Sequence, residues 1–150
     1  VTLYLTPGHT PGTVSALVPV HAAGKPLTLS LFGSVAFPSN FEPNEKNGGL
    51  RKYDASVLRF AKVSQQAGAR GILNTHVFAD GGLAKLEAVR AGKGRPFTTS
   101  PALIGRYYGV LHECLQAALA RPETNVDWSK AGSAPSAGAA PAQGKAQPKR

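Results

Sequence analysis

The sequence has few residues of the kinds that cross-link a chain or carry it into a membrane. Cys114 is the single cysteine among 150 residues, so no disulfide can form within the chain. The cysteine content therefore does not distinguish a reducing from an oxidising compartment. No apolar run approaches the roughly 18 residues that a membrane-spanning helix needs. No leader peptide is visible, although a truncated start would hide one. We therefore expect no membrane span, and the length suffices for one domain with a real core.

Acidic residues are also scarce. Only 8 aspartates and glutamates stand against 17 lysines and arginines, which gives a net charge of +9. Such an excess attracts nucleic acid or an anionic surface by electrostatics alone. However, no nucleic-acid motif and no interleaving of aromatic with basic residues accompanies the charge. The composition therefore argues against a nucleic-acid partner, and a basic binding module stays open as an alternative function.

Residues 122–150 differ in composition from the rest of the chain. Beyond Trp128 they contain Ala, Gly, Ser, Pro, Gln and basic residues, with no large apolar side chain. Such a segment cannot offset the entropy that is lost when a chain is ordered. We expect a disordered basic tail at 122–150 after a folded portion at 1–121.

One stiff loop holds a histidine. The run TPGHTPGT at 6–13 lies between two strand patterns and places His9 near its centre. Its prolines fix φ, and its glycines allow backbone angles or close approaches that a side chain forbids. A loop that loses little further entropy suits a metal ligand. The residues alone leave two interpretations open, a metal ligand or a proline-rich turn with an incidental histidine.

The remaining pattern alternates strands with helices, which is typical of an α/β domain. Apolar residues alternate along the strand segments and recur at spacings of three and four along the helical ones. Gly24 suits a hairpin turn, and Gly68 and Gly92 suit helix ends. Ser100 with Pro101 suits a helix start. We predict strands at 1–5, 13–20, 25–32 and 71–74, and helices at 50–67, 81–91 and 101–121.

Three features of these elements carry specific expectations. Leu27, Leu29 and Leu31 form an aliphatic strand face, which we expect to pack on the core. Cys114 falls on the apolar stripe of the last helix, so we expect it to be buried. Asp80 precedes a helix and is expected to cap it, with a hydrogen bond to an imidazole as the alternative.

Two motifs resemble metal-binding segments of the metallo-β-lactamase superfamily. The run TPGHTPGTVS at 6–15 is similar to the third metal-binding motif of that superfamily. The run LNTHVFADG at 73–81 is similar to the segment that carries its last histidine ligand. Together with flanking similarity, these motifs cover nearly everything from Val1 to about Ala120. The flanking runs that look like the subclass-three metallo-β-lactamases lie at 53–60, 95–97, 106–108 and 113–114.

The resemblance implies a fold and a partner half. The fold is α/β, half of a metallo-β-lactamase-like αβ/βα sandwich, with a mixed sheet and helices on one face. The superfamily's HxHxDH motif, which supplies most of the metal ligands, does not occur in these residues. A start inside a strand pattern, in a chain without methionine, leads us to expect the C-terminal half of a longer protein. The resemblance to this family also implies that the protein is periplasmic or secreted. Alone, such a half would expose the sheet face that its partner covers.

The same resemblance implies a two-zinc hydrolase. His9 would complete one zinc site with two histidines from the missing half, and His76 would complete the other with a missing aspartate and histidine. The pair of zinc ions in the complete protein would lower the pKa of a bridging water towards neutrality. The resulting hydroxide would attack a β-lactam amide. This chain alone is expected to be inactive, because two histidines do not hold zinc tightly.

Ser34 is the expected substrate contact. It stands where many hydrolases of the superfamily carry a bridging aspartate, and in this it agrees with subclass three. It is a candidate to hydrogen-bond the carboxylate of a substrate. Thr75 stands where that subclass more often has an asparagine, so a lactone or another ester stays open as the substrate. A non-catalytic fragment or a basic binding module is the alternative to a hydrolase.

Overall fold

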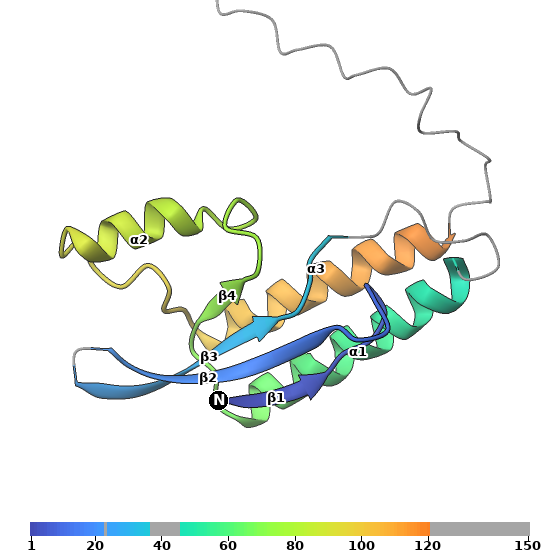
Figure 1. Cartoon of the computed structure of the whole chain (residues 1–150), viewed down its shortest axis with the longest axis horizontal. Coiled ribbons are helices and arrows are strands. Elements are labelled where there is room, and N and C mark those ends of the chain that lie inside the picture. The colour runs from blue at the N-terminus through green and yellow to red at the C-terminus, as the bar shows by residue number, and fades with distance from the viewer. Residues whose placement is uncertain (23, 37–45, 121–150) are drawn as a thin grey trace, which may run out of the picture.

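The computed structural model describes residues 1–22, 24–36 and 46–120, and the predicted tail at 122–150 lies outside them. The described part forms one mixed sheet with accompanying helices (Figure 1). Every predicted element is present, with small shifts at the ends. None of the described helices is long and apolar enough to cross a bilayer. The elements are β1 (Thr2–Leu5), β2 (Val14–Ala22), β3 (Lys25–Phe32), α1 (Lys46–Gln66), β4 (Ile72–Asn74), α2 (Gly82–Arg90) and α3 (Pro101–Ala120).

The sheet order β1-β2-β3-β4 brings three strand ends to one border. β1 pairs antiparallel with β2, β2 pairs antiparallel with β3, and β3 pairs parallel with β4. Consequently β1, β3 and β4 run in the same direction, and their carboxyl ends share a border of the sheet. Gly24 has a φ of 75° between β2 and β3, as expected for the hairpin. The predicted mixed sheet is confirmed.

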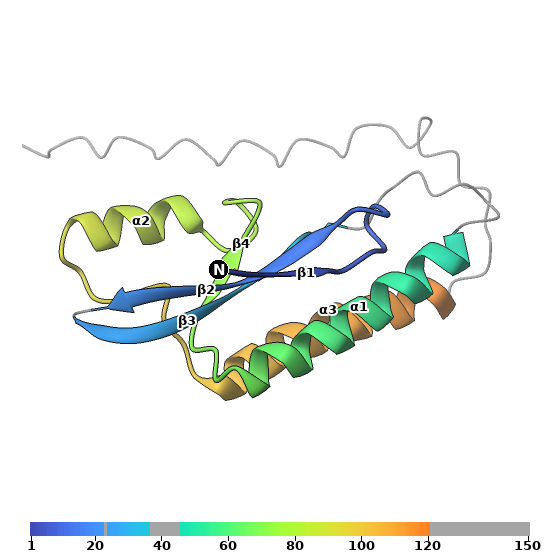
Figure 2. The same ribbon diagram turned by 60° about the horizontal axis from the view of Figure 1, so that its bottom comes forward.

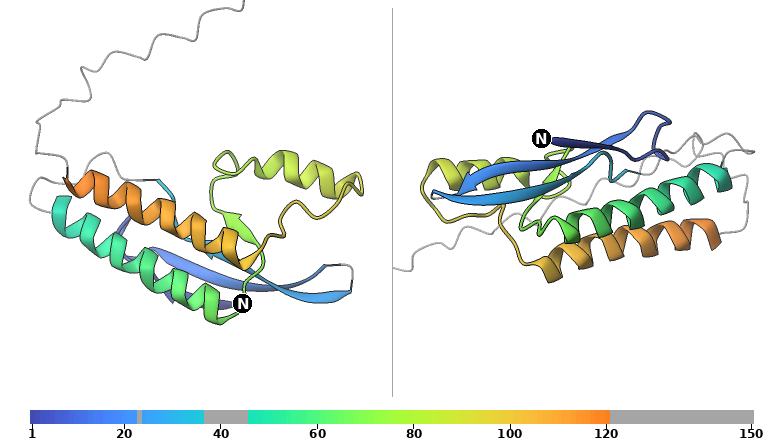
Figure 3. Two further views of the ribbon diagram at one scale, coloured as in Figure 1. Left: turned by 180° about the vertical axis from the view of Figure 1, so that it is seen from behind. Right: turned by 90° about the horizontal axis from the view of Figure 1, so that it is seen from below.

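Helices α1 and α3 lie side by side on one face of the sheet (Figures 2 and 3). Phe32 of β3 is at the centre of the core between them and the sheet. Its ring centroid lies 5.9 Å from those of Tyr53 and Tyr108 and 6.0 Å from that of Phe60. The buried helix residues recur at spacings of three and four, as predicted for amphipathic helices. They are Leu50, Tyr53, Val57 and Phe60 in α1, and Ile104, Tyr108, Leu111 and Leu115 in α3.

The face of β3 that meets the helices is not the predicted one. Ser30 and Phe32 contact the helix layer, so the leucine face lies on the other side of the sheet. Ser30 tolerates burial because its hydroxyl lies 2.7 Å from that of Ser64 and 2.6 Å from that of Tyr108. Alternation distinguishes two faces of a strand but does not say which face meets the helices. The prediction that these leucines pack on the core is therefore borne out only for Leu29, which is buried on the other side of the sheet, while Leu27 and Leu31 are half-buried.

Cys114 is exposed, so the prediction that it is buried is wrong. The buried stripe of α3 passes through Leu111 and Leu115, at the spacing of one turn. Cys114 precedes Leu115 by one position, which is about 100° around the helix. The stripe drawn from the sequence is therefore wider than the face of α3 that contacts α1 and the sheet.

The other face of the sheet keeps apolar side chains exposed to solvent. Leu3, Leu5 and Val14 are 68%, 57% and 44% exposed. Helix α2 lies beyond β4, away from the layer of α1 and α3 (Figures 1 and 2), and its Leu83 and Val89 are exposed as well. The exposure near β1 agrees with the expectation of an uncovered sheet face, whereas Ala16 and Leu29 on the same face are buried.

Candidate metal centre

Three loops at one border of the sheet carry the predicted site residues. His9 lies in the loop after β1, Ser34 follows β3, and His76 follows β4. Because these strands run in the same direction, all three residues leave the sheet at the same border. The three residues thus lie along one border, with β2 and β3 between the strands that precede His9 and His76, and their roles stay predictions.

His9 is held in a way that leaves one ring nitrogen for a ligand. Its Nδ1 lies 2.8 Å from the carbonyl oxygen of Ala36, which can only accept, so Nδ1 carries the proton. In the neutral ring the lone pair is then on Nε2. Metal-bound histidines almost always donate their other ring N–H to a partner of this kind. His9 therefore fits a zinc ligand that binds through Nε2.

Buried polar contacts hold the loop around His9. Thr6 is fully buried, and its N–H donates to the Thr13 carbonyl at 2.7 Å. The Thr6 hydroxyl shares a 2.7 Å hydrogen bond with the hydroxyl of Ser15 in β2. From the other side, the Ser56 hydroxyl of α1 donates to the Pro7 carbonyl at 2.7 Å. The stiffness expected from the prolines and glycines is thus reinforced by β2 and α1.

Gly8 allows the closest approach between this loop and α1. Its φ is 142°, a backbone conformation that L-residues with side chains rarely adopt. A Cβ at this position would lie 2.2 Å from the Cα of Tyr53. The ring of His9 lies 6.4 Å from the ring of Tyr53, edge to face. A glycine at position 8 therefore lets the His9 loop rest directly on the backbone of α1.

Ser34 is buried and connected to the turn that anchors His9. The Ala36 N–H donates to Ser34 Oγ at 3.3 Å, and the Ser34 hydroxyl donates to the Ala36 carbonyl at 3.5 Å. The Tyr53 hydroxyl donates to the Ser34 carbonyl at 2.5 Å. Burial raises the pKa of Tyr53 to about 12, so this hydroxyl remains a donor at neutral pH. Ser34 therefore orders the turn in which the Ala36 carbonyl accepts the hydrogen bond from His9 Nδ1.

His76 lies on an exposed turn just after β4. Its Nδ1 is 3.3 Å from the hydroxyl of Thr75, and its ring is 5.3 Å from that of Phe78. The strand end before it is braced from α3, because the Tyr107 hydroxyl donates to Asn74 Oδ1 at 2.7 Å. Burial raises the pKa of Tyr107, which keeps this donor protonated. His76 is therefore an accessible imidazole next to a braced strand end.

Asp80 does not cap α2, contrary to the prediction. The residue before the helix is Gly81, which has a φ of 67°, and no side chain caps this end. Asp80 Oδ2 instead accepts a hydrogen bond from the ammonium group of Lys85 at 2.8 Å. The left-handed Gly81 separates Asp80 from the helix start, and the ion pair engages its carboxylate. Within the described ranges, Asp80 has no hydrogen bond to an imidazole.

Two tyrosines and one backbone carbonyl support the site, and no sequence motif predicts their contribution. Tyr53 falls on a predicted apolar stripe, where its ring is expected and its hydroxyl bond is not. Tyr107 likewise counts as apolar in the stripe of the last helix. A buried tyrosine usually finds a partner for its hydroxyl, and that general rule was the available signal. The Ala36 carbonyl leaves no trace in side-chain chemistry.

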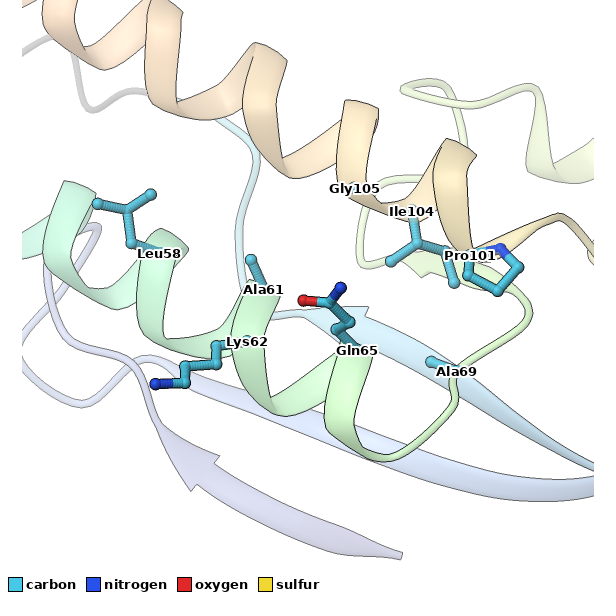
Figure 4. Close-up of a pocket in the computed structure, with 8 residues that line it drawn as sticks. All are labelled: Leu58, Ala61, Lys62, Gln65, Ala69, Pro101, Ile104 and Gly105. Carbon is cyan, nitrogen blue, oxygen red and sulfur yellow. The ribbon is translucent and has the colours of Figure 1, made fainter.

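The part of the chain that the structure describes does not contain a complete metal site. No group of three or more His, Cys, Asp and Glu side chains gathers there in a metal-binding arrangement. A hollow of about 420 Å³ between α1 and α3 has Lys62 and Gln65 as its longest polar side chains (Figure 4). It is lined by no histidine and no carboxylate, so it adds no ligand to His9 and His76.

Comparison with known proteins bears on the fold. No protein-family model matches the chain, and no curated protein matches it. Among solved structures, BJP-1, a subclass B3 metallo-beta-lactamase of Bradyrhizobium japonicum, is similar with a TM-score of 0.62 at 24% identity. The FEZ-1 metallo-beta-lactamase from Legionella gormanii has a TM-score of 0.62 at 21% identity. The Rm3 metallo-beta-lactamase has a TM-score of 0.56 at 21% identity.

Each of these similarities covers 79% of this chain and 44% of the other one. Over most of its length the chain therefore has the fold of part of the subclass B3 metallo-β-lactamase structure, as the motif resemblance predicted. It spans less than half the length of the solved structures that it matches. At these identities the likeness establishes the fold, and the activity has to be argued from the site.

Proposed function

We propose that this chain supplies His9 and His76 to the zinc site of a hydrolase that resembles β-lactamases. The observation that carries the proposal is the hydrogen bond from His9 Nδ1 to the Ala36 carbonyl, at the border where the His76 loop also leaves the sheet. This bond presents Nε2 of His9 as a lone-pair donor. The metallo-β-lactamase fold supports the same assignment.

Each residue at the border has a separate role in this proposal. His9 binds one zinc ion through Nε2, while its Nδ1–H fixes the tautomer and the ring orientation. His76 binds a second zinc ion through its accessible ring. Zinc bound there would lower the pKa of a coordinated water towards neutrality and provide a hydroxide nucleophile. The Ser34 hydroxyl is buried in this chain, so in this proposal it hydrogen-bonds the carboxylate of the substrate once the turn to Ala36 has opened.

The remaining ligands belong, in this proposal, to an N-terminal half of a longer protein. The chain spans only 44% of the length of BJP-1 and of FEZ-1, which supports a larger parent. The proposed parent holds two zinc ions and lies in the periplasm or outside the cell. The names of the similar structures favour a β-lactam as the substrate. A lactone or another ester is the alternative on the same fold.

The zinc content of the full-length gene product tests the assignment of ligands. We expect His9→Ala and His76→Ala each to lose about one zinc ion per protein, as required of a site with two metals. His21→Ala is the matched control, because His21 is an exposed histidine at the hairpin end of β2, away from the border. Elemental analysis of the purified variants gives the counts. An unchanged zinc content in both variants contradicts the proposal, and so does an equal loss in the control.

A further inference from the structure

A second hollow lies at the end of the sheet opposite to the histidine loops. It measures about 560 Å³ and is formed by the hairpin end of β2 and β3 together with segments before β4 and before α3. Figure 1 shows the hairpin and the chain that follows α2 at this end of the molecule. The length of β3 separates it from the border that carries His9, roughly 20–25 Å at about 3.3 Å per residue. The hollow therefore plays no part in the proposed zinc chemistry.

Three cationic side chains from three separate segments line this hollow. They are Lys25 at the start of β3, Arg70 before β4 and Arg95 after α2. No acidic residue lines it. The ion pairs within the described residues involve other groups, so these three cations have no carboxylate partner there. Like charges that converge without a counter-charge create a positive potential, which a bound anion relieves.

The backbone of residues 98–99 connects the backbone positions of the two arginines. The Thr99 N–H donates to the Arg70 carbonyl at 2.7 Å. The Thr98 N–H and hydroxyl donate to the Arg95 carbonyl at 2.9 and 2.7 Å. The Arg70 N–H in turn donates to the Thr28 carbonyl of β3 at 2.9 Å, which connects this unit to the sheet. The backbone positions of both arginines are thus fixed relative to each other, while their exposed side chains still lose rotamer freedom when an anion binds.

The start of α3 adds partial positive charge on the same side. Ser100 lines the hollow, and its Oγ accepts a hydrogen bond from the Leu103 N–H at 3.2 Å as the helix cap. The amino end of a helix favours anions because its first N–H groups and the macrodipole are directed there. This contribution supports the arginine and lysine cluster and would not define a site without it.

We propose that this hollow binds a compact anion that carries phosphate groups. Guanidinium groups form paired, charge-assisted hydrogen bonds with phosphate oxygens, and lysine adds a mobile positive charge. The volume falls within the range of roughly 300–1,000 Å³ that is typical of small-ligand sites. The ligand class is a small phosphorylated molecule, for which pyrophosphate and inorganic phosphate are the simplest probes. The site is independent of the histidine border and of the proposed hydrolase.

Calorimetric titration of the 150-residue chain with pyrophosphate at low salt tests this site. We expect the double variant Arg70→Gln and Arg95→Gln to bind pyrophosphate at least tenfold more weakly, as the loss of charge-assisted hydrogen bonds implies. The double variant Arg51→Gln and Lys52→Gln is the control, since it removes the same two positive charges from exposed positions near the start of α1. Weakening that is equally large in the control overturns the proposal, because it shows attraction to net charge alone.

Two further measurements keep the test decisive. Amide NMR shifts of Thr98, Thr99 and Ser100 should follow the titration in the wild-type chain and stay still in the double variant. A thermal melt of the double variant should match that of the wild type, because the backbone bonds of this unit do not need the arginine side chains. Pyrophosphate that leaves these amides unmoved contradicts the proposal. A single-stranded oligonucleotide is the second probe. The proposal is also contradicted if the chain binds no pyrophosphate but binds the oligonucleotide tightly, with the same affinity in the double variant as in the wild type.

Discussion

The hydroxyl of Tyr53 offers a direct test of how α1 positions the proposed zinc ligand. Tyr53→Phe removes the hydrogen bond to the Ser34 carbonyl. The substitution keeps the ring, which stacks on Phe32 at 5.9 Å with an interplanar angle of 8°. The change therefore separates the polar contact from the packing of the core.

The expected cost follows from the burial of the acceptor. A buried carbonyl that loses its donor costs about 1–3 kcal/mol in the free energy of unfolding. At about 4 °C per kcal/mol for a domain of this size, this loss lowers the melting temperature by roughly 4–12 °C. The second effect reaches His9, because the Ser34 turn holds the Ala36 carbonyl in place. With that turn loosened, we expect His9 to lose part of its preference for a proton on Nδ1.

Long-range ¹H–¹⁵N NMR of the histidine ring reports the tautomer of His9 without any metal. The wild-type chain should show Nδ1 protonated and Nε2 bare, and Tyr53→Phe should show a mixture. Tyr4→Phe is the matched control, because Tyr4 packs on Phe60 at 5.5 Å and its hydroxyl has no hydrogen bond within the described residues. A wild-type ring with its proton on Nε2 would refute this reasoning. An unchanged tautomer in a clearly destabilised Tyr53→Phe would refute the proposed connection from α1 to His9.

Two more predictions concern the same contact between α1 and the loops. Gly8→Ala should destabilise the chain by about 2–5 kcal/mol in urea unfolding, because it adds backbone strain and a clash with α1, whereas Gly12→Ala, which meets nothing within 4 Å, should cost far less. An equal cost at both positions contradicts the close approach. The pKa of Tyr53 is raised from 10.0 to about 12, so its contribution to stability is fully present below pH 10 and is lost as the pH rises through about 12. Unfolding free energies from pH 9 upward should therefore decline less steeply in Tyr53→Phe than in the wild type.

Local rules were sufficient to predict the elements of this fold. Gly24 adopts the positive φ that a hairpin turn requires, and Gly68 and Gly92 do the same where helices end. Ser100 accepts the hydrogen bond from Leu103 that its place before Pro101 predicts. These features depend on a few neighbouring residues, so a single sequence contains the necessary information.

The orientation of each element required information that lies far away in the chain. Ser30 faces the helices because Ser64 and Tyr108 provide hydroxyl partners from α1 and α3. A polar residue at a strand's core face becomes favourable only when such partners are present. The alternation of leucines with Thr28 and Ser30 therefore suggested the wrong face. Asp80 failed as a cap for a related reason, since Lys85 competes for its carboxylate.

The candidate site divides in the same way between local and distant information. His9 and His76 could be selected from motifs, and their common border follows from strand direction. The supports of the site could not be selected, because the Ala36 carbonyl and the Tyr53 hydroxyl act only through the folded geometry. A motif identifies which imidazole is available. The surrounding structure decides which of its nitrogens is free to bind.

The uncovered sheet face and the incomplete ligand set have one explanation under the proposed function. Leu5 and Val14 pair with each other at the carboxyl end of β1, next to the His9 loop, and both are exposed. Any segment that covers them must therefore approach the border that His9 and His76 share. Burying such side chains is favourable by about 25 cal/mol per Å² of apolar surface. If the covering segment carries the missing ligands, as the proposed function requires, this contact would bring them to the border next to the His9 loop, so that covering the face and completing the zinc site would be coupled.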